Sequence, residues 1–251
     1  MAQIWTQTLL SIAAVSLVSL VGGLTLVLRS RFDLLLTGLT AFAAGGLLGN
    51  SFLHMLPEAV ETHGFGVQTS ATVLAGIVVF FLFEKLLLWR HEHGDGSHDH
   101  AHATKPYAFT AVFGDALHNF IDGAVIASAC AAGSQLGMAT TLAVVLHEVP
   151  QELGDFGVLV KGGVPPGRAL VMNFLSALVA FAGGIVALLM EGQHASLIAM
   201  VVPFSAGGFI YVAAADLIPE MHREMSTGRS ILQVLLLVAG MAMMALMLPG
   251  A

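Results

Sequence analysis

Long apolar runs separated by short polar breaks dominate the pattern of hydrophobic and polar positions along the chain. A bilayer core of about 30 Å needs about 20 apolar residues in a helix, so each run predicts one membrane-spanning helix. The runs do not alternate polar and apolar residues as membrane-barrel strands do, which favours helices throughout. The eight predicted spans are residues 4–28, 33–56, 67–89, 107–130, 136–160, 169–190, 195–218 and 230–249.

The composition agrees with an integral membrane protein in contact with the lipid bilayer. Hydrophobic residues make up 57% of the chain and charged residues 10%, with a mean hydropathy of +0.86. Soluble domains carry about 25% charged residues, so most classes of soluble enzyme are excluded. The net charge of −7 leaves no basic surface for nucleic acid, and Cys130 as the only cysteine excludes an intrachain disulfide.

The basic residues predict how the chain is oriented. With eight alternating spans, every Lys and Arg falls on one side: Arg29, Arg31, Lys85, Arg90, Lys105, Lys161, Arg168, Arg223 and Arg229. The opposite loops carry Glu58, Glu61 and Glu191 instead. Because basic loops stay in the cytoplasm, both termini are expected outside. The compact chain favours the inner (cytoplasmic) membrane of a bacterial cell.

Six residues of the second predicted span recur in the seventh at a constant separation of 162 residues. Phe42, Gly45, Gly46, His54, Pro57 and Glu58 correspond to Phe204, Gly207, Gly208, Asp216, Pro219 and Glu220. These spans cross in opposite directions, which predicts an inverted-topology repeat of the kind many transporters contain; the alternative is chance sharing of small residues. The expected fold is all-α with eight helices in a 3+2+3 arrangement. Its parts are residues 1–90 (first repeat), 91–105 (loop), 106–160 (central pair) and 161–251 (second, inverted repeat).

The central pair carries polar residues that the other spans avoid. They are Asp115, His118, Asn119 and Asp122 in one span, and His147, Glu148, Gln151, Glu152 and Asp155 in the next. Their spacing places each set on one helix face. A carboxylate at the helix centre costs roughly 2.5–3.5 kcal/mol to insert, and no Lys or Arg lies at that depth to pair with these groups or with Asp216. Either several carboxylates are protonated, or a bound cation supplies the missing charge.

The donor types narrow the choice of cation. Imidazole nitrogen and carboxylate oxygen without thiolate favour Zn²⁺, Fe²⁺, Mn²⁺ or Cd²⁺ over alkali metals or Ca²⁺. His118 and Asp122 are one helical turn apart, as are His147 and Gln151, so each pair offers two donors on one face. The alternative is a set of interhelical hydrogen bonds without metal. Pro150 removes a backbone hydrogen bond within this group and softens the helix there.

Two motifs resemble those of the ZIP (Zrt/Irt-like) family of divalent-metal transporters. They are HNFIDG at residues 118–123 and HEVPQELGDF at residues 147–156. The chain is most similar to the branch that carries HExPHE, from which it departs by Gln151 in place of a second His. The eight spans, the outside termini, the inverted repeat and a His-rich loop after the third span extend the resemblance over nearly the whole chain.

The resemblance implies a two-metal centre between the fourth and fifth spans. One site would use His118, His147, Gln151 and His54, and its neighbour Asn119, Asp122, Glu148 and Asn173. Gln151 would occupy the bridging position, although a neutral amide binds a cation weakly. Asn50 stands at the outer entrance and Asp216 on the exit path. Asp115, Glu152 and Asp155 support the site or the path.

Residues 91–105 (HEHGDGSHDHAHATK) predict a disordered cytoplasmic loop. Its histidines, His91, His93, His98, His100 and His102, are expected to capture metal weakly; the alternative is a soluble linker.

We therefore expect uptake of a divalent transition metal, with zinc favoured, by alternating access, and neither enzymatic activity nor a catalytic cofactor. The runner-up function is an intramembrane zinc hydrolase, because His147-Glu148-x-x-Gln151 is one residue short of HExxH. Transport in the efflux direction is a further alternative, and a metal sensor is another. The sequence leaves metal preference, proton coupling and homodimer formation open.

Overall fold

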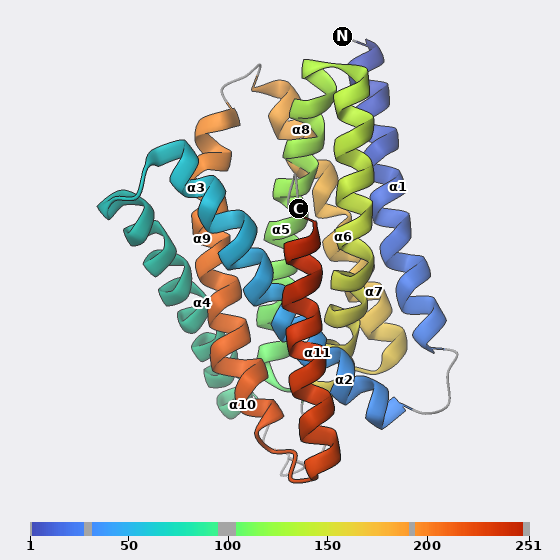
Figure 1. The fold of residues 1–251 in the computed structure, drawn as a ribbon, viewed down its shortest axis with the longest axis vertical. Coiled ribbons are helices and arrows are strands. Elements are labelled where there is room, and N and C mark those ends of the chain that lie inside the picture. Colours follow the sequence, from blue (N-terminus) through green and yellow to red (C-terminus); the bar gives the residue numbers. More distant parts are fainter. Residues whose placement is uncertain (1, 28–31, 95–103, 191–193, 248–251) are drawn as a thin grey trace.

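The computed structural model describes residues 2–27, 32–94, 104–190 and 194–247, which form helices joined by short turns (Figure 1). These ranges contain no strand, so the all-helical class is confirmed. The helices are α1 (Ala2–Val27), α2 (Phe32–Gly49), the π-helix η1 (Asn50–Met55), α3 (Leu56–His63), α4 (Val67–Gly94), α5 (Pro106–Ala132), α6 (Ser134–Lys161), α7 (Pro166–Ala177), α8 (Val179–Leu189), α9 (His194–Tyr211), the π-helix η3 (Val212–Leu217), α10 (Ile218–Met221) and α11 (Thr227–Leu246).

Five stretches of the described helices are long and apolar enough to cross a membrane. They are Leu36–Thr62, Val67–Leu86, Pro166–Leu189, Ala199–Met221 and Thr227–Leu246. The stretches in α4 and α11 are only 17% buried inside the molecule, so their apolar side chains face outward. The long helices α5 and α6 are not among the five. The chain thus has the architecture of a multi-pass membrane protein.

Two helix boundaries differ from the pattern-based expectation. The helix α4 continues to Gly94, so the backbone of residues 91–94, expected in the loop, is helical. The rest of that loop, residues 95–103, lies outside the described residues. The apolar run 169–190 is divided at Leu178 into α7 and α8. Helix can propagate into a polar segment when nothing in it stops the backbone, and composition alone does not reveal this.

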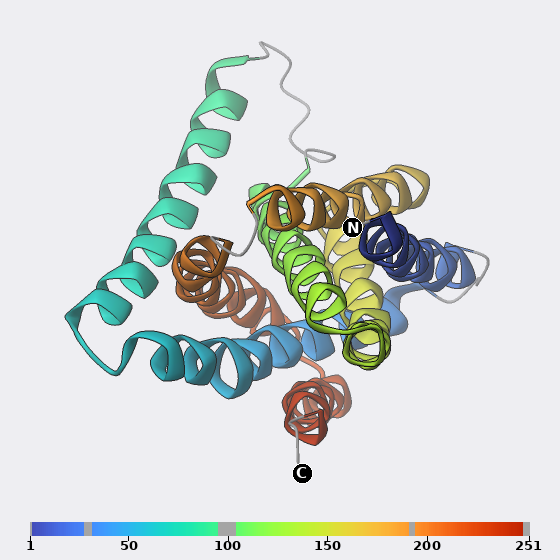
Figure 2. The same cartoon turned by 90° about the horizontal axis from the view of Figure 1, so that it is seen from above.

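The helix α5 lies at the centre of the bundle. It packs against α1, α4, α6, α7, α8 and α9, and the view along the bundle shows α5 surrounded by its neighbours (Figure 2). More than half of its residues are buried, including Asp115, His118, Asn119 and Asp122. The polar stripe predicted for this helix therefore faces other helices rather than the bilayer.

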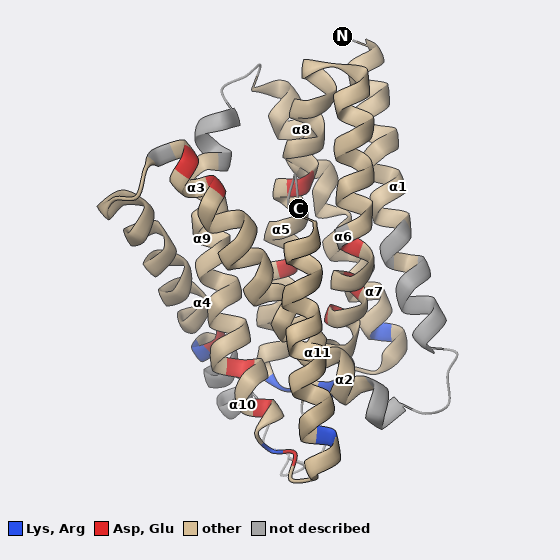
Figure 3. Cartoon of the chain, viewed as in Figure 1, with Lys and Arg blue, Asp and Glu red and all other residues tan. Residues whose placement is uncertain are grey.

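Charge is separated along the long axis of the molecule. The described Lys and Arg residues gather at one end, where α10 and the start of α11 lie (Figure 3). We call this the basic end; its residues are Lys85, Lys105, Lys161, Arg168, Arg223 and Arg229. The helix α3, which carries Glu58 and Glu61, lies at the opposite end.

Glycines allow α5 and α8 to touch backbone to backbone. A Cβ atom at Gly123 would clash with the carbonyl oxygen of Ala180, and one at Gly183 would clash with the carbonyl oxygen of Phe120. The contact is reciprocal, so neither helix can move away from the other without losing both close approaches. Small residues favour such packing in membranes, where lipid tails are as apolar as the helices themselves.

A second set of glycine contacts follows the predicted repeat. Gly45 of α2 lies against the Leu237 carbonyl of α11, and Gly207 of α9 lies against the Val73 carbonyl of α4. Gly45 and Gly207 are separated by 162 residues, and their partners by 164. The pair α2–α11 thus packs in the same way as the pair α9–α4.

The π-helices recur at the same separation. Asn50–Met55 and Val212–Leu217 each contain six residues and begin 162 residues apart. Each precedes a short helix with proline near its start, Pro57 in α3 and Pro219 in α10. His54 and Asp216 occupy the same position within their π-helices, a correspondence of backbone geometry that the sequence pattern alone does not contain.

Replacing Gly183 with alanine is expected to destabilise the fold, because the added Cβ overlaps the Phe120 carbonyl oxygen. Overpacking of this kind costs about 1–3 kcal/mol or more. In a chain of this size each kcal/mol lowers the melting temperature by about 2–4 °C. Thermal unfolding of purified protein in detergent measures the effect. Gly167→Ala is the control, since nothing lies within 4 Å of its added Cβ; equal melting temperatures for both variants would contradict the packing argument.

Candidate metal site

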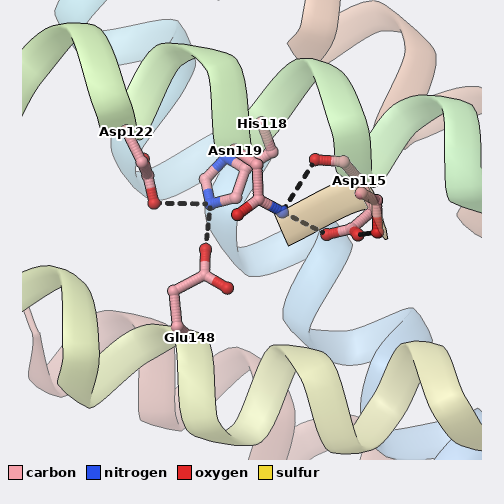
Figure 4. Close-up of polar contacts among 6 residues, drawn as sticks. Asp115, His118, Asn119, Asp122 and Glu148 are labelled. Atoms are coloured by element: carbon pink, nitrogen blue, oxygen red, sulfur yellow. Dashed lines mark hydrogen bonds and ion pairs between the residues drawn. The ribbon is translucent and has the colours of Figure 1, made fainter. Parts of the chain in front are cut away.

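Three ionisable side chains meet between α5 and α6. His118 and Asp122 lie one turn apart on α5, and Glu148 approaches them from α6 (Figure 4). His118 Nε2 is 3.6 Å from Asp122 Oδ2 and 3.7 Å from Glu148 Oε1. One donor atom of each residue lies within 4.8 Å of the other two, and all three residues are buried.

These separations suit donors arranged around a metal ion. Nitrogen–oxygen distances of 3.6 and 3.7 Å are longer than hydrogen bonds. Ligand atoms that each lie about 2.1 Å from a tetrahedral metal are about 3.4 Å from one another. The three side chains therefore need only small adjustments to bind one transition-metal ion.

Neighbouring residues fix the orientation of this group. The His118 ring packs against Phe209 of α9, with ring centroids 5.6 Å apart, and Phe209 is itself buried. Pro150 lies inside α6, two residues after Glu148. It has no N–H to donate to the Leu146 carbonyl, so the helix is locally less constrained beside Glu148.

A cavity leads to this group from the end opposite the basic end. Its volume is about 270 Å³, and it extends from exposed Glu58 to buried His118 and Asp122. Asn50 and His54 of η1 line it as well. Asn50 is buried, and its Nδ2 has no hydrogen-bond partner within the described part of the chain. The structure thus places His54 and Asn50 along an approach to His118.

The hydrogen bond of His54 determines which ring nitrogen remains available. His54 Nε2 is 2.8 Å from the carbonyl oxygen of Met244. A carbonyl only accepts, so Nε2 carries the proton and donates. The other nitrogen, Nδ1, is then unprotonated in the neutral ring and is able to bind a cation.

Behind the group, Asn119 is held by Asp115. Asn119 Nδ2 donates to Asp115 Oδ1 and to the Asp115 carbonyl, both at 3.1 Å (Figure 4). Ser176 of α7 in turn donates to Asp115 Oδ2. These hydrogen bonds fix the orientation of the Asn119 side chain. Its Oδ1 atom has no hydrogen-bond partner within the described residues.

A similar contact holds Asn173, also on α7. Its Nδ2 donates to the Glu152 carboxylate and, at 3.1 Å, to the Glu152 carbonyl. The Asn173 Oδ1 atom has no hydrogen-bond partner in the described chain. Asp115 and Glu152 therefore link α7 to α5 and α6.

Gln151 and Asp155 lie further along α6 than Glu148. Both line a small cavity between α6, α2 and α11, whose other lining residues include Phe42, Gly46 and Met244. Both are buried. Neither residue is among those that line the cavity containing His118 and Asp122.

Several expected ligands lie outside the described residues. The backbone of His147 belongs to α6, but its side chain is not among those described. The same holds for His91 and His93 of α4. His98, His100 and His102 fall within residues 95–103, which the structure does not describe.

At the basic end, Asp216 of η3 lies near a second group of polar residues. Tyr211 Oη donates to Glu84 Oε2 of α4 at 2.6 Å. Asp216 is partly buried, and its Oδ2 has no hydrogen-bond partner in the described chain. Lys105 forms an ion pair with Glu220 of α10. These residues lie at the basic end, opposite the end of the molecule that carries α3 and Glu58.

Sequence reasoning did not place Glu58, Thr140 or Met244 at the site, although all three line the cavity. Glu58 follows His54 by one helical turn, so this spacing could have predicted that both side chains lie on one helix face. Met244 contributes a carbonyl oxygen, and nothing in the side-chain pattern reveals a backbone contact 190 residues away.

Ser176→Ala is expected to weaken binding of a divalent cation, because Asp115 loses its donor and holds Asn119 less firmly. Loss of a group that positions a metal ligand typically costs about 10–100-fold in metal affinity. Isothermal titration calorimetry with Zn²⁺ measures this affinity. Ser128→Ala is the control, since Ser128 donates to the Ala124 carbonyl of its own helix at 2.7 Å and is not among the residues that line the cavity; equal affinities for both variants would contradict the positioning role.

Known proteins are similar to this chain over most of its length. The family model for the ZIP zinc transporter matches residues 5–105 and 88–248. The zinc transporter SLC39A7 of Rattus norvegicus is 34% identical over 86% of this chain and 65% of its own length. The zinc transporter ZIP13 of Pongo abelii is 33% identical over 83% of this chain and 65% of its own length. The zinc transporter zipt-7.1 of Caenorhabditis briggsae is 31% identical, over 82% and 69%.

The chain thus spans about two thirds of the length of these relatives, 65% in the rat protein. The family model covers nearly all of it, including the polar stripes of α5 and α6. The resemblance based on residues 118–123 and 147–156 is confirmed, and the chain belongs to the ZIP zinc transporter family.

Proposed function

We propose that this chain carries a divalent transition metal across a membrane, with Zn²⁺ as the favoured substrate. The buried group His118, Asp122 and Glu148 carries the proposal, because its donor atoms lie within 4.8 Å of one another at the end of a cavity. In α5 there is no Lys or Arg, and in α6 Lys161 is the last residue. A cation between these helices would supply the positive charge that the sequence does not.

The chemistry of the donors and the names of the relatives together favour zinc. One imidazole and two carboxylates suit Zn²⁺, Fe²⁺, Mn²⁺ and Cd²⁺. The relatives are named zinc transporters. His147 and His54 complete the coordination of the first ion in this proposal. Asn119 and Asn173, each with an oxygen that has no hydrogen-bond partner, support a weaker second site beside Asp122.

The direction of transport is uptake, from the end with Glu58 to the basic end. Loops rich in Lys and Arg remain in the cytoplasm, so the basic end is the cytoplasmic one and both termini are outside in the inner membrane of a cell. Metal would enter along the cavity past Glu58 and His54. It would leave past Asp216 toward the histidines of residues 91–102.

Eight spans in a 3+2+3 arrangement account best for the helices. The helices before α5 form the first repeat, α5 and α6 the central pair, and the helices after α6 the second, inverted repeat. The recurring π-helices and the matching glycine contacts of α2–α11 and α9–α4 support this division. Alternating access then follows from movement of one group of helices against the other.

An intramembrane hydrolase is the weaker candidate. Glu148 would serve as a general base beside a zinc ion held by His147 and Gln151. Gln151, however, stands where that motif needs a second His, and a neutral amide binds a cation weakly. The donors on α5 have no role in a site of that kind. The relatives are named transporters, which also favours transport over catalysis.

Zinc entry into proteoliposomes that contain an encapsulated zinc-sensitive dye tests the proposal. The wild-type protein is expected to give saturable entry, and His118→Ala to reduce it at least about tenfold, because the imidazole nitrogen that would bind the metal is lost. Glu148→Gln is expected to act in the same way. His222→Ala is the matched control, since His222 is exposed outside the cavity.

If His118→Ala left zinc entry unchanged, the assignment of His118 to the metal site would be wrong. Absence of entry with folded wild-type protein that still binds zinc would favour the hydrolase or sensor instead. Loading zinc inside the vesicles and measuring its exit at known protein orientation separates uptake from efflux.

A further inference from the structure

A buried carboxylate with two cationic partners lies at the basic end. Lys105 Nζ is 2.7 Å from Glu220 Oε1, and Arg223 Nη1 is 3.1 Å from Glu220 Oε2. The Glu220 side chain is only 11% exposed, whereas those of Lys105 and Arg223 are 37% and 72% exposed. Each carboxylate oxygen therefore has its own cation, and Glu220 is shielded from water more than either partner.

The Lys105 contact joins parts of the fold that are distant in sequence. Lys105 immediately precedes α5, and its backbone N–H donates to the Gly162 carbonyl just after α6, at 2.7 Å. Lys105 thus ties together the ends of the two helices that contain the candidate metal site. Its side chain connects the same point to Glu220 of α10. If α5 and α6 move together relative to α10, the backbone bond is preserved and the ion pair breaks.

Glu220 has a counterpart in the other half of the chain. Glu58 precedes it by 162 residues, and each follows a π-helix and a proline. Glu58 is exposed at the mouth of the cavity, at the end away from the described Lys and Arg residues. Equivalent glutamates therefore have opposite environments: one faces an open cavity, and the other is enclosed by cations.

We propose that Lys105, Glu220 and Arg223 form an inner latch, which keeps the cytoplasmic end of the metal path closed while the outer cavity is open. Release of metal requires the Lys105–Glu220 ion pair to break. The latch rests on the proposed function, since it presumes transport by alternating access.

An ion pair is suited to this role because it is specific in position and still reversible. Partly exposed ion pairs contribute little net stability, so separating one does not require unfolding. The side chains of Lys105 and Arg223 reach water while the latch is closed, and they remain hydrated when it opens. Glu220 gains hydration when the latch opens, which offsets the loss of its partners.

Reversible cross-linking of the latch tests the proposal. Lys105→Cys and Glu220→Cys are introduced together with Cys130→Ala, which removes the only native thiol. A short bis-methanethiosulfonate reagent then links the pair, and dithiothreitol releases it. The linked protein is expected to lose at least nine tenths of its zinc flux into proteoliposomes but to bind zinc from outside as tightly as the unlinked protein. Flux is expected to return after reduction, which shows that the protein remained folded.

The matched control links Glu224→Cys to Arg229→Cys in the same background. That native ion pair, 3.3 Å long, lies at the same end but joins the turn after α10 to the start of α11. The N–H of Ser226 donates to Glu224 at 2.9 Å and holds the pKa of Glu224 below its usual value, so this pair is also ionised. Cross-linking it is expected to leave zinc flux unchanged.

The outcomes separate the latch from the transport function. Undiminished flux through the linked Lys105–Glu220 pair would overturn the latch while leaving zinc transport intact. Equal loss of flux in the linked control pair would also overturn it, since any constraint at this end would then suffice. Absence of flux in the wild-type protein would overturn the proposed function, and the latch with it.

Charge exchange provides a second measurement that needs no cross-linker. Lys105→Glu places two carboxylates together and is expected to raise the KM for outside zinc severalfold, because the outward-open state loses its closure. Combining it with Glu220→Lys restores an ion pair and is expected to return the KM toward the wild-type value. A double variant with the summed defects of both single variants would contradict a direct interaction.

Discussion

The absence of basic residues beside the carboxylates of α5 and α6 is the constraint on which the rest of the structure depends. Asp115, Asp122, Glu148 and Glu152 are buried among apolar helices, and α5 contains no Lys or Arg. Burying charge without a partner is costly, so each group needs a hydrogen-bond donor, a proton or a cation. Ser176 and Asn173 supply donors for Asp115 and Glu152. Asp122 and Glu148 lie near His118, where a bound cation would complete the charge balance in the function proposed above.

The tight helix packing holds this polar group in place. The reciprocal contacts of Gly123 and Gly183 bring α8 against α5, and Phe209 limits the orientation of the His118 ring. The membrane offers no hydrophobic force between helices, so close contact and interhelical hydrogen bonds must hold them together. The side chains of the candidate metal site are therefore positioned by packed helices.

Much of this arrangement could be read from the sequence, and the remainder depends on contacts between distant residues. The apolar runs predicted every long helix, and the helical spacing of His118 and Asp122 predicted a shared face. The motif resemblance gave the family. The extension of α4 to Gly94 was not expected, because a segment rich in His and Gly has the composition of a loop. The cavity position of Glu58, the place of Gln151 beside a small cavity and the ion pair of Lys105 with Glu220 all depend on tertiary packing, which no periodic pattern encodes.

The paired π-helices give this protein two places where the helical register is not fixed. In each, an N–H reaches back five residues instead of four: Leu56 to the Ser51 carbonyl, and Ile218 to the Ala213 carbonyl. A π-helix accommodates one residue more than an α-helix does over the same length. Returning it to α geometry would rotate everything beyond it by about 100°, one residue's share of a helical turn. The glutamates that follow, Glu58 and Glu220, are thus attached to segments that can turn about their own axes without any hydrogen-bonded helix being unwound.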